Sequence, residues 1–157
     1  MSKLKPIPRS RAKTAYGLVR AVIRAIRAEP KRADITTFYN RRHPEDGGPA
    51  CGTVGCFAGW VCLLRDGRKG FDMRAMQILG EHMNYSIPGS QGHSVFNSGK
   101  GDACESTTPG TKAHSRAVIA RIKKFIAVNE NALRARRLRP VPAVSPHGLP
   151  QNNSLLL

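Results

Sequence analysis

The chain has 157 residues, with 26 Lys and Arg against ten Asp and Glu, and its formal net charge of +16 predicts an affinity for polyanions. Nucleic acid is the commonest partner of such a charge, and an anionic membrane surface is the next. No stretch approaches the roughly 18 apolar residues that cross a bilayer, and the basic N-terminal segment lacks the apolar core of a secretory signal, so we expect a cytoplasmic protein.

Charge and proline content divide the chain into one helical domain, residues 14–137, between two basic ends. Residues 1–13 carry Pro6 and Pro8 among lysines and arginines, which is typical of a flexible arm. Residues 138–157 contain four prolines and predict a disordered tail. We expect an all-α fold, a small bundle of four to five helices with long loops and flexible basic termini.

Residues 13–28 have the period of an amphipathic helix that ends before Pro30. Its expected apolar face consists of Leu18, Val19, Val22, Ile23 and Ile26. Basic residues recur at spacings of three and four and share another face: Arg20, Arg24, Arg27 and Lys31. Because no acidic residue lies between Arg20 and Arg27, this face favours contact with an anion over an ordinary solvated surface.

Residues 51–62 concentrate three of the four cysteines and the only tryptophan, with small residues between large apolar ones. Thr53 is the expected N-cap of a helix from about Val54 to Arg65. We expect this segment to be buried in the core. The residues of the motif are Cys51, Gly52, Thr53, Cys56, Ala58, Gly59 and Trp60.

The cysteine spacing is a poor match to metal or redox chemistry. Zinc sites usually contain two close pairs such as C-x2-C, whereas Cys62 lies about 240° around a helix from Cys56, at about 100° per residue. Thiol catalysis by Cys56 would need a histidine base and an oxyanion site. Candidate bases by type alone are His43, His82 and His114. We expect buried thiols, no metal, no cofactor and no enzymatic activity, with structural zinc and thiol catalysis as alternatives.

A short helix is expected from Asp72, its N-cap, to Leu79, with Gly80 as its stop. Met73, Met76 and Leu79 would form its apolar face. Together with the preceding helix it leaves a helix-turn-helix over residues 54–80 as an alternative, although the turn is slightly long for that motif.

Residues 81–108 lose their periodicity, and only Val95 and Phe96 are expected to be anchored. The last helix is expected from about Pro109 to Arg137, with Thr108 as its cap. Its expected buried stripe is Val118, Ile119, Ile122, Phe125, Ile126 and Leu133. A second basic cluster lies near its end: Arg134, Arg136, Arg137 and Arg139.

The pattern Cys51-Gly52-Thr53-x-x-Cys56-x-Ala58-Gly59-Trp60 resembles the signature of a group of small bacterial and phage proteins of uncharacterised function. Weaker similarities are Pro30 after the first helix, Leu79-Gly80, Val95-Phe96 and residues 121–129, so that the resemblance covers roughly residues 15–130. It implies a common small helical fold and no activity, and it adds residence within a phage particle as an alternative to the cytoplasm. The chain departs from the group in its glycine-rich stretch after Tyr85 and in its basic ends.

These patterns together predict a nucleic-acid-binding accessory protein that contacts DNA or RNA mainly through phosphates, without base recognition. The alternative is a phage or bacterial assembly protein whose basic arms enter a nucleoprotein particle or neighbouring subunits. The expected binding residues are Lys3, Lys5, Arg9, Arg11, Lys13, Arg20, Arg24, Arg27, Lys31, Arg134, Arg136, Arg137 and Arg139.

Overall fold

The computed structural model describes residues 8–30, 57–67, 72–88, 94–96, 106–108 and 110–140. These residues form four helices: α1 Ala15–Ala28, α2 Phe57–Asp66, α3 Asp72–Leu79 and α4 Lys112–Ala135. The described ranges contain no strand, only two isolated bridges. The expected all-α fold is therefore confirmed. None of these four helices is long and apolar enough to cross a bilayer.

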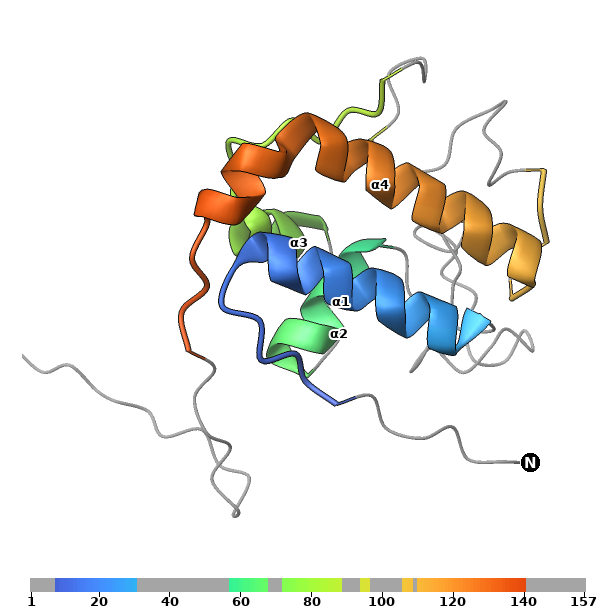
Figure 1. The fold of residues 1–157 in the computed structure, drawn as a ribbon, viewed down its shortest axis with the longest axis horizontal. Coiled ribbons are helices and arrows are strands. Elements are labelled where there is room, and N and C mark those ends of the chain that lie inside the picture. Colours follow the sequence, from blue (N-terminus) through green and yellow to red (C-terminus); the bar gives the residue numbers. More distant parts are fainter. Residues whose placement is uncertain are drawn as a thin grey trace, which may run out of the picture.

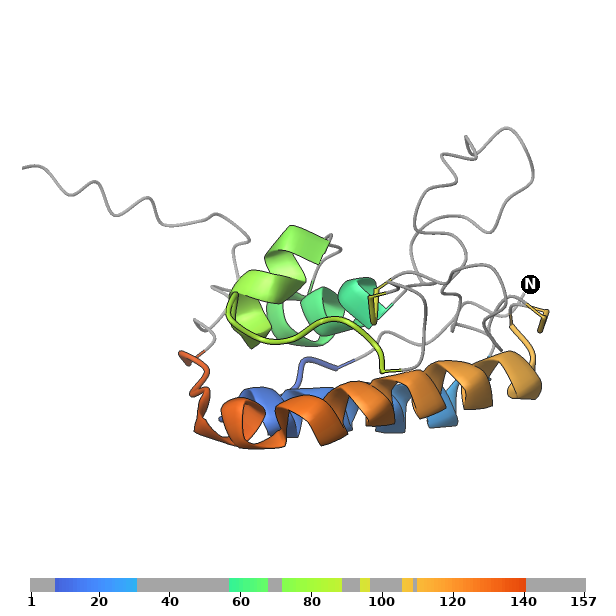
Figure 2. The same cartoon turned by 90° about the horizontal axis from the view of Figure 1, so that it is seen from above.

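The helices are arranged in two layers (Figures 1 and 2). α1 and α4 lie side by side, α2 packs on α3, and α1 contacts α2 across the layers. The start of α1 meets the end of α4, where the backbone N–H of Ala15 donates to the carbonyl of Arg136 at 2.9 Å. Ser115 near the start of α4 donates to the carbonyl of Pro30, beyond the end of α1, at 3.1 Å. Helices α1 and α4 are thus antiparallel neighbours joined at both ends.

Helix α1 follows the sequence prediction closely. Thr14 caps it by accepting a hydrogen bond from the backbone N–H of Gly17 at 3.1 Å, so the helix begins at Ala15. It ends at Ala28, two residues before Pro30. The predicted apolar face is buried throughout: Leu18, Val19, Val22, Ile23 and Ile26.

Helix α2 forms the centre of the core, as expected for the cysteine segment. Trp60 is only 1% exposed, and the Cys62 thiol is buried. The ring of Phe57 lies 5.8 Å from that of Phe96 and 5.6 Å from that of Phe125, measured between centroids. Aromatic packing therefore joins α2 to α4 and to the segment at residues 94–96.

Helix α3 has the predicted bounds, and its predicted apolar face is correct at Leu79 and at the half-buried Met76 but wrong at Met73. Met73 is 65% exposed, whereas Ala75, Ile78 and Leu79 are buried. An eight-residue helix with methionines on one side and Ala75 and Ile78 on the other has two possible apolar stripes, and packing against α2 selects between them. The predicted stop at Gly80 is confirmed, since its φ of +129° suits glycine.

Helix α4 begins at Lys112, later than predicted, because Gly110 has a φ of +80° that is incompatible with an α-helix. Thr111, not Thr108, is the N-cap and accepts a hydrogen bond from the backbone N–H of His114. The helix ends at Ala135 rather than Arg137, which is paired with Thr14 in an antiparallel bridge. The predicted buried stripe is confirmed except at Ile126, which is half-buried.

Residues 84–87 are more firmly anchored than expected. Tyr85 stacks between Phe96 and Phe125, with ring centroids 5.0 and 5.4 Å away. Its hydroxyl donates to the carbonyl of Gly80 at 2.7 Å, and burial raises its pKa to about 12. Ile87 is also buried, so the expectation that only Val95 and Phe96 are anchored was wrong.

Asn129 ties this segment to α4 and supports a first testable prediction. Its side chain accepts from the N–H of Asn84 at 2.8 Å and donates to the carbonyl of Asn84 at 2.7 Å. Asn129→Ala should therefore lower the free energy of unfolding by about 1–3 kcal/mol, as measured by urea denaturation. Asn131→Ala is the control, since this exposed residue on the same helix gains the same helix propensity without losing these bonds. Equal stability of the two variants would contradict this role.

Candidate nucleic-acid interface

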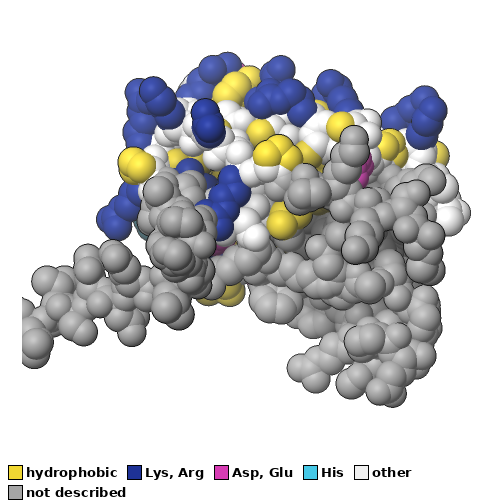
Figure 3. All heavy atoms as spheres, turned by 90° about the horizontal axis from the view of Figure 1, so that it is seen from below, with side chains coloured by type: hydrophobic (Ala, Val, Ile, Leu, Met, Phe, Trp, Pro, Cys, Tyr) yellow, Lys and Arg dark blue, Asp and Glu magenta, His cyan; other side chains and the backbone are white. Residues whose placement is uncertain are grey.

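The two layers of the fold differ in charge. Helices α2 and α3 each carry one arginine and one aspartate. Helix α1 carries three arginines and no acid, and α4 carries six Lys or Arg and a single acid, Glu130. Glu130 is itself engaged by Arg134 at 2.7 Å. The excess positive charge of the helices therefore lies on the α1/α4 layer, and Figure 3 shows Lys and Arg side chains gathered along that side.

On α1 the positive charges form one row, which we call the α1 row: Arg20, Arg24 and Arg27. All three side chains are exposed and lie opposite the buried face of the helix. The other flank of the helix carries small, uncharged residues, of which Ala21 is half-buried and Ala28 is exposed. The positive charge of α1 is thus confined to one strip of its surface.

On α4 three exposed cations form a second row, which we call the α4 row: Arg116, Lys123 and Arg134. Their spacings of seven and eleven residues are close to two and three helical turns, so they lie on one side of the helix. The guanidinium carbon of Arg134 lies 3.9 Å from the centre of the Tyr16 ring on α1. This contact shows that the α4 row borders α1.

The two rows flank the line along which α1 and α4 meet. Tyr16 links them, because its ring lies beneath Arg134 and its hydroxyl oxygen lies 3.5 Å from Nη1 of Arg20. Arg20 and Arg27 follow Tyr16 by four and eleven residues, so they lie on its side of α1. We call the surface formed by the α1 row and the α4 row the basic face.

Of the other three cations of α4, Lys112 is exposed at the first position of the helix, four residues before Arg116, and two lie off the basic face. Lys124 is exposed, but it points about 100° around the helix from Lys123 and away from α1. Arg121 is only 4% exposed and donates to the carbonyl of Ser94. Burial lowers the pKa of Arg121 to about 10, so its side chain stays charged at neutral pH. It contributes to packing inside the fold and not to the basic face.

The residues expected in the N-terminal arm are divided by the structure. Lys3 and Lys5 lie outside the described residues, as does Lys31. Residues 8–13 lie against the helices, where we expected a flexible arm, because the N–H of Ser10 donates to the carbonyl of Leu64 at 2.7 Å.

The cations of this segment are placed at different points. Arg9 is exposed but packs over Gly67, where an added Cβ would clash with its guanidinium, so it lies at the end of α2 and not on the basic face. Arg11 and Lys13 are exposed just before α1 begins.

The cluster at the end of α4 is divided in the same way. Arg136 turns toward α3 and donates to the carbonyl of Gln77 at 2.9 Å. It thereby satisfies one of the carbonyls that the end of a helix leaves unpaired. Arg137 and Arg139 are exposed beyond α4, so only Arg134 of this cluster joins the basic face.

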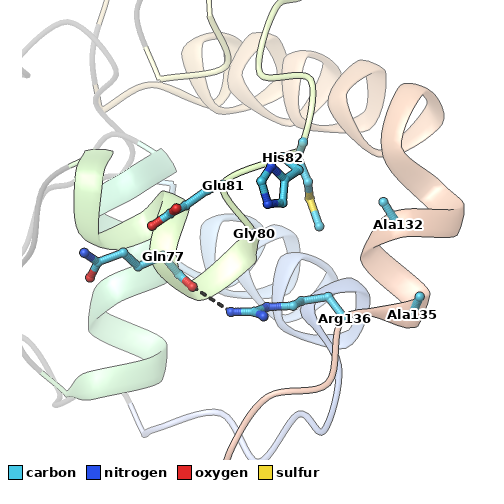
Figure 4. Close-up of a pocket in the computed structure, with 8 residues that line it drawn as sticks. Gln77, Gly80, Glu81, His82, Ala132, Ala135 and Arg136 are labelled. Carbon is cyan, nitrogen blue, oxygen red and sulfur yellow. Dashed lines mark hydrogen bonds between the residues drawn. The ribbon is translucent and has the colours of Figure 1, made fainter.

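A groove of about 500 Å³ lies where the ends of α3 and α4 meet, and Arg136 crosses it (Figure 4). Its lining residues are Gln77, Gly80, Glu81, His82, Met83, Ala132, Ala135 and Arg136. The lining includes a histidine but no cysteine, so this groove does not provide the cysteine and histidine pair that thiol catalysis would need.

The cysteine motif is described only in part. Ala58 and Trp60 are buried and Gly59 is half-buried on α2, while Cys51, Gly52, Thr53 and Cys56 lie outside the described residues. Within the described ranges no three His, Cys, Asp or Glu side chains are grouped to hold a metal ion. The expected absence of metal stays a prediction, because the cysteines needed to test it fall mostly outside these ranges.

Arg116 and Lys123 were not predicted as members of the interface, because the sequence does not indicate which helix lies beside them. The sequence does show that Arg116, Lys123 and Arg134 are spaced by seven and eleven residues and so share one side of the helix. This spacing indicates an interface only once α1 is known to border that side.

Comparison with protein-family models, curated proteins and solved structures found no match to this chain. The resemblance suggested by the cysteine motif therefore stays a prediction.

Proposed function

We propose that the protein binds nucleic acid through the basic face, mainly by contacts to phosphates. The observation that carries this proposal is the segregation of charge between the two layers. Helices α1 and α4 have one acid among nine cations, whereas α2 and α3 are balanced. A basic protein whose charge served only solubility would not need its cations gathered on one layer.

Phosphate contact, rather than base recognition, is the mode that this surface favours. Its cations are exposed along the sides of two helices that lie flat in one layer. Helix α3 would be the recognition helix of a helix-turn-helix, but it carries one arginine and one aspartate and so offers no excess positive charge. A face of exposed Lys and Arg supplies the sequence-independent part of binding.

The proposal predicts similar affinity for unrelated sequences. Fluorescence anisotropy with several labelled duplexes of equal length and different sequence should give dissociation constants that agree within about threefold, because phosphates carry no base information. A preference of about a thousandfold for one sequence would instead indicate base contacts, contradicting this mode of binding.

The same titration distinguishes the proposal from its main alternative. A phage or bacterial assembly protein would instead bind an acidic partner protein or a neighbouring subunit through its positive charge. Failure to bind any nucleic acid at about 50 mM salt, where phosphate contacts are strong, would overturn the proposed function and favour that alternative.

A further inference from the structure

We infer that the preferred ligand is double-stranded, with the α1 row contacting the phosphates of one strand and the α4 row contacting those of the other. This inference rests on the proposed function and specifies the class of nucleic acid. The basic face has two rows of cations, on adjoining sides of two antiparallel helices. A single strand has one row of phosphates and would need only one row of cations.

The dimensions of the basic face fit this arrangement. Packed helices have axes about 8–10 Å apart, which sets the scale of the separation between the rows. The grooves of a DNA duplex are about 6 and 12 Å wide, so two rows of phosphates border a groove at a comparable separation. The α4 row extends from Arg116 to Arg134, about 27 Å of helix, along which one strand offers about eight phosphates.

The aromatic residues argue against a single strand. Proteins that bind single strands without sequence preference stack the bases on aromatic side chains. Tyr16 is the aromatic residue at the basic face, and its ring is covered by Arg134 at 3.9 Å. The other aromatic rings of the described helices and segments lie in the core: Phe57, Trp60, Tyr85, Phe96 and Phe125. The described surface therefore offers phosphate contacts without a platform for stacking.

The test compares the salt dependence of binding for three labelled probes of equal length: duplex DNA, duplex RNA and a single strand that cannot pair with itself. If a duplex engages both rows and a single strand only one, the slope of log affinity against log salt should be about 2.5-fold steeper for the duplex. Equal numbers of contacts would give a ratio of only about 1.3, because each phosphate contributes about 0.9 in a duplex and about 0.7 in a single strand. The two duplex probes identify which backbone is preferred. Equal affinity and equal slope for the single strand would overturn this inference while leaving the proposed function intact, whereas no binding of any probe would overturn both.

A pair of single variants tests the α4 row directly. Lys123→Ala should flatten the duplex slope by about 0.9, the contribution of one phosphate contact. Lys124→Ala is the matched control, since it removes the same charge from the next residue of the same helix but on the side away from α1. Equal effects of the two variants would show that total charge, and not the α4 row, determines binding, and would overturn the inference.

Discussion

Replacing Trp60 with alanine is expected to lower the free energy of unfolding by about 3–5 kcal/mol, the cost of removing a large buried aromatic side chain. Trp60 is 1% exposed and is among the largest fully buried side chains of the described core. Its helix also positions Phe57, which packs on Phe96 and Phe125. The loss would be a large fraction of the roughly 5–15 kcal/mol that stabilises a typical domain.

Urea denaturation followed by far-ultraviolet circular dichroism measures this loss without relying on the tryptophan signal. Met73→Ala is the control, because Met73 is 65% exposed on α3 and its truncation should change stability by no more than about 0.5 kcal/mol. Equal unfolding midpoints for the two variants would contradict the assignment of α2 to the core. A water-like emission spectrum of Trp60 in the native protein would contradict it independently.

Reversing the α1 row with Arg20→Glu, Arg24→Glu and Arg27→Glu is expected to have the largest effect on binding. Each phosphate contact contributes about 0.9 to the slope of log affinity against log salt. Three contacts therefore account for a factor of about 500 between ~1 M and ~0.1 M salt, and reversal adds repulsion. We expect duplex affinity at ~0.1 M salt to fall by at least about 10²-fold, alike for all sequences.

The three reversed positions are exposed and outside the core, so the helical circular dichroism of the variant should match that of the parent protein. Arg74→Glu serves as a control, since it changes charge by the same amount per residue on the neutral α2/α3 layer. A folded triple variant that binds duplex as tightly as the parent protein would show that the α1 row does not contact nucleic acid.

Local signals were sufficient to predict much of the fold. The three-and-four period and Pro30 located α1 within two residues, although its cap, Thr14, was not predicted. Asp72 and Gly80 bounded α3 correctly, because a helix start and a glycine with positive φ are properties of a few neighbouring residues. Met73 was wrongly placed on the apolar face of α3, because two stripes were available and only contact with α2 selects one.

The interface was harder to predict because it depends on which helices are neighbours. The α1 row was visible in the sequence, since all its members belong to one helix. The α4 row emerges only when Arg134 is seen against Tyr16. Two expected members of the interface contact other parts of the fold instead: Arg9 packs over Gly67, and Arg136 donates to the carbonyl of Gln77. No local sequence pattern distinguishes such arginines from those that are available to bind a ligand.

The salt dependence of duplex binding by the unaltered protein tests the central claim most directly. If the two rows of the basic face together neutralise about six phosphates, log affinity should fall linearly with log salt at a slope near −5. The slope should flatten by about 2.7 when the α1 row is replaced by alanine. A slope near zero, or one that the removal of these three arginines leaves unchanged, would contradict binding of nucleic acid through the basic face.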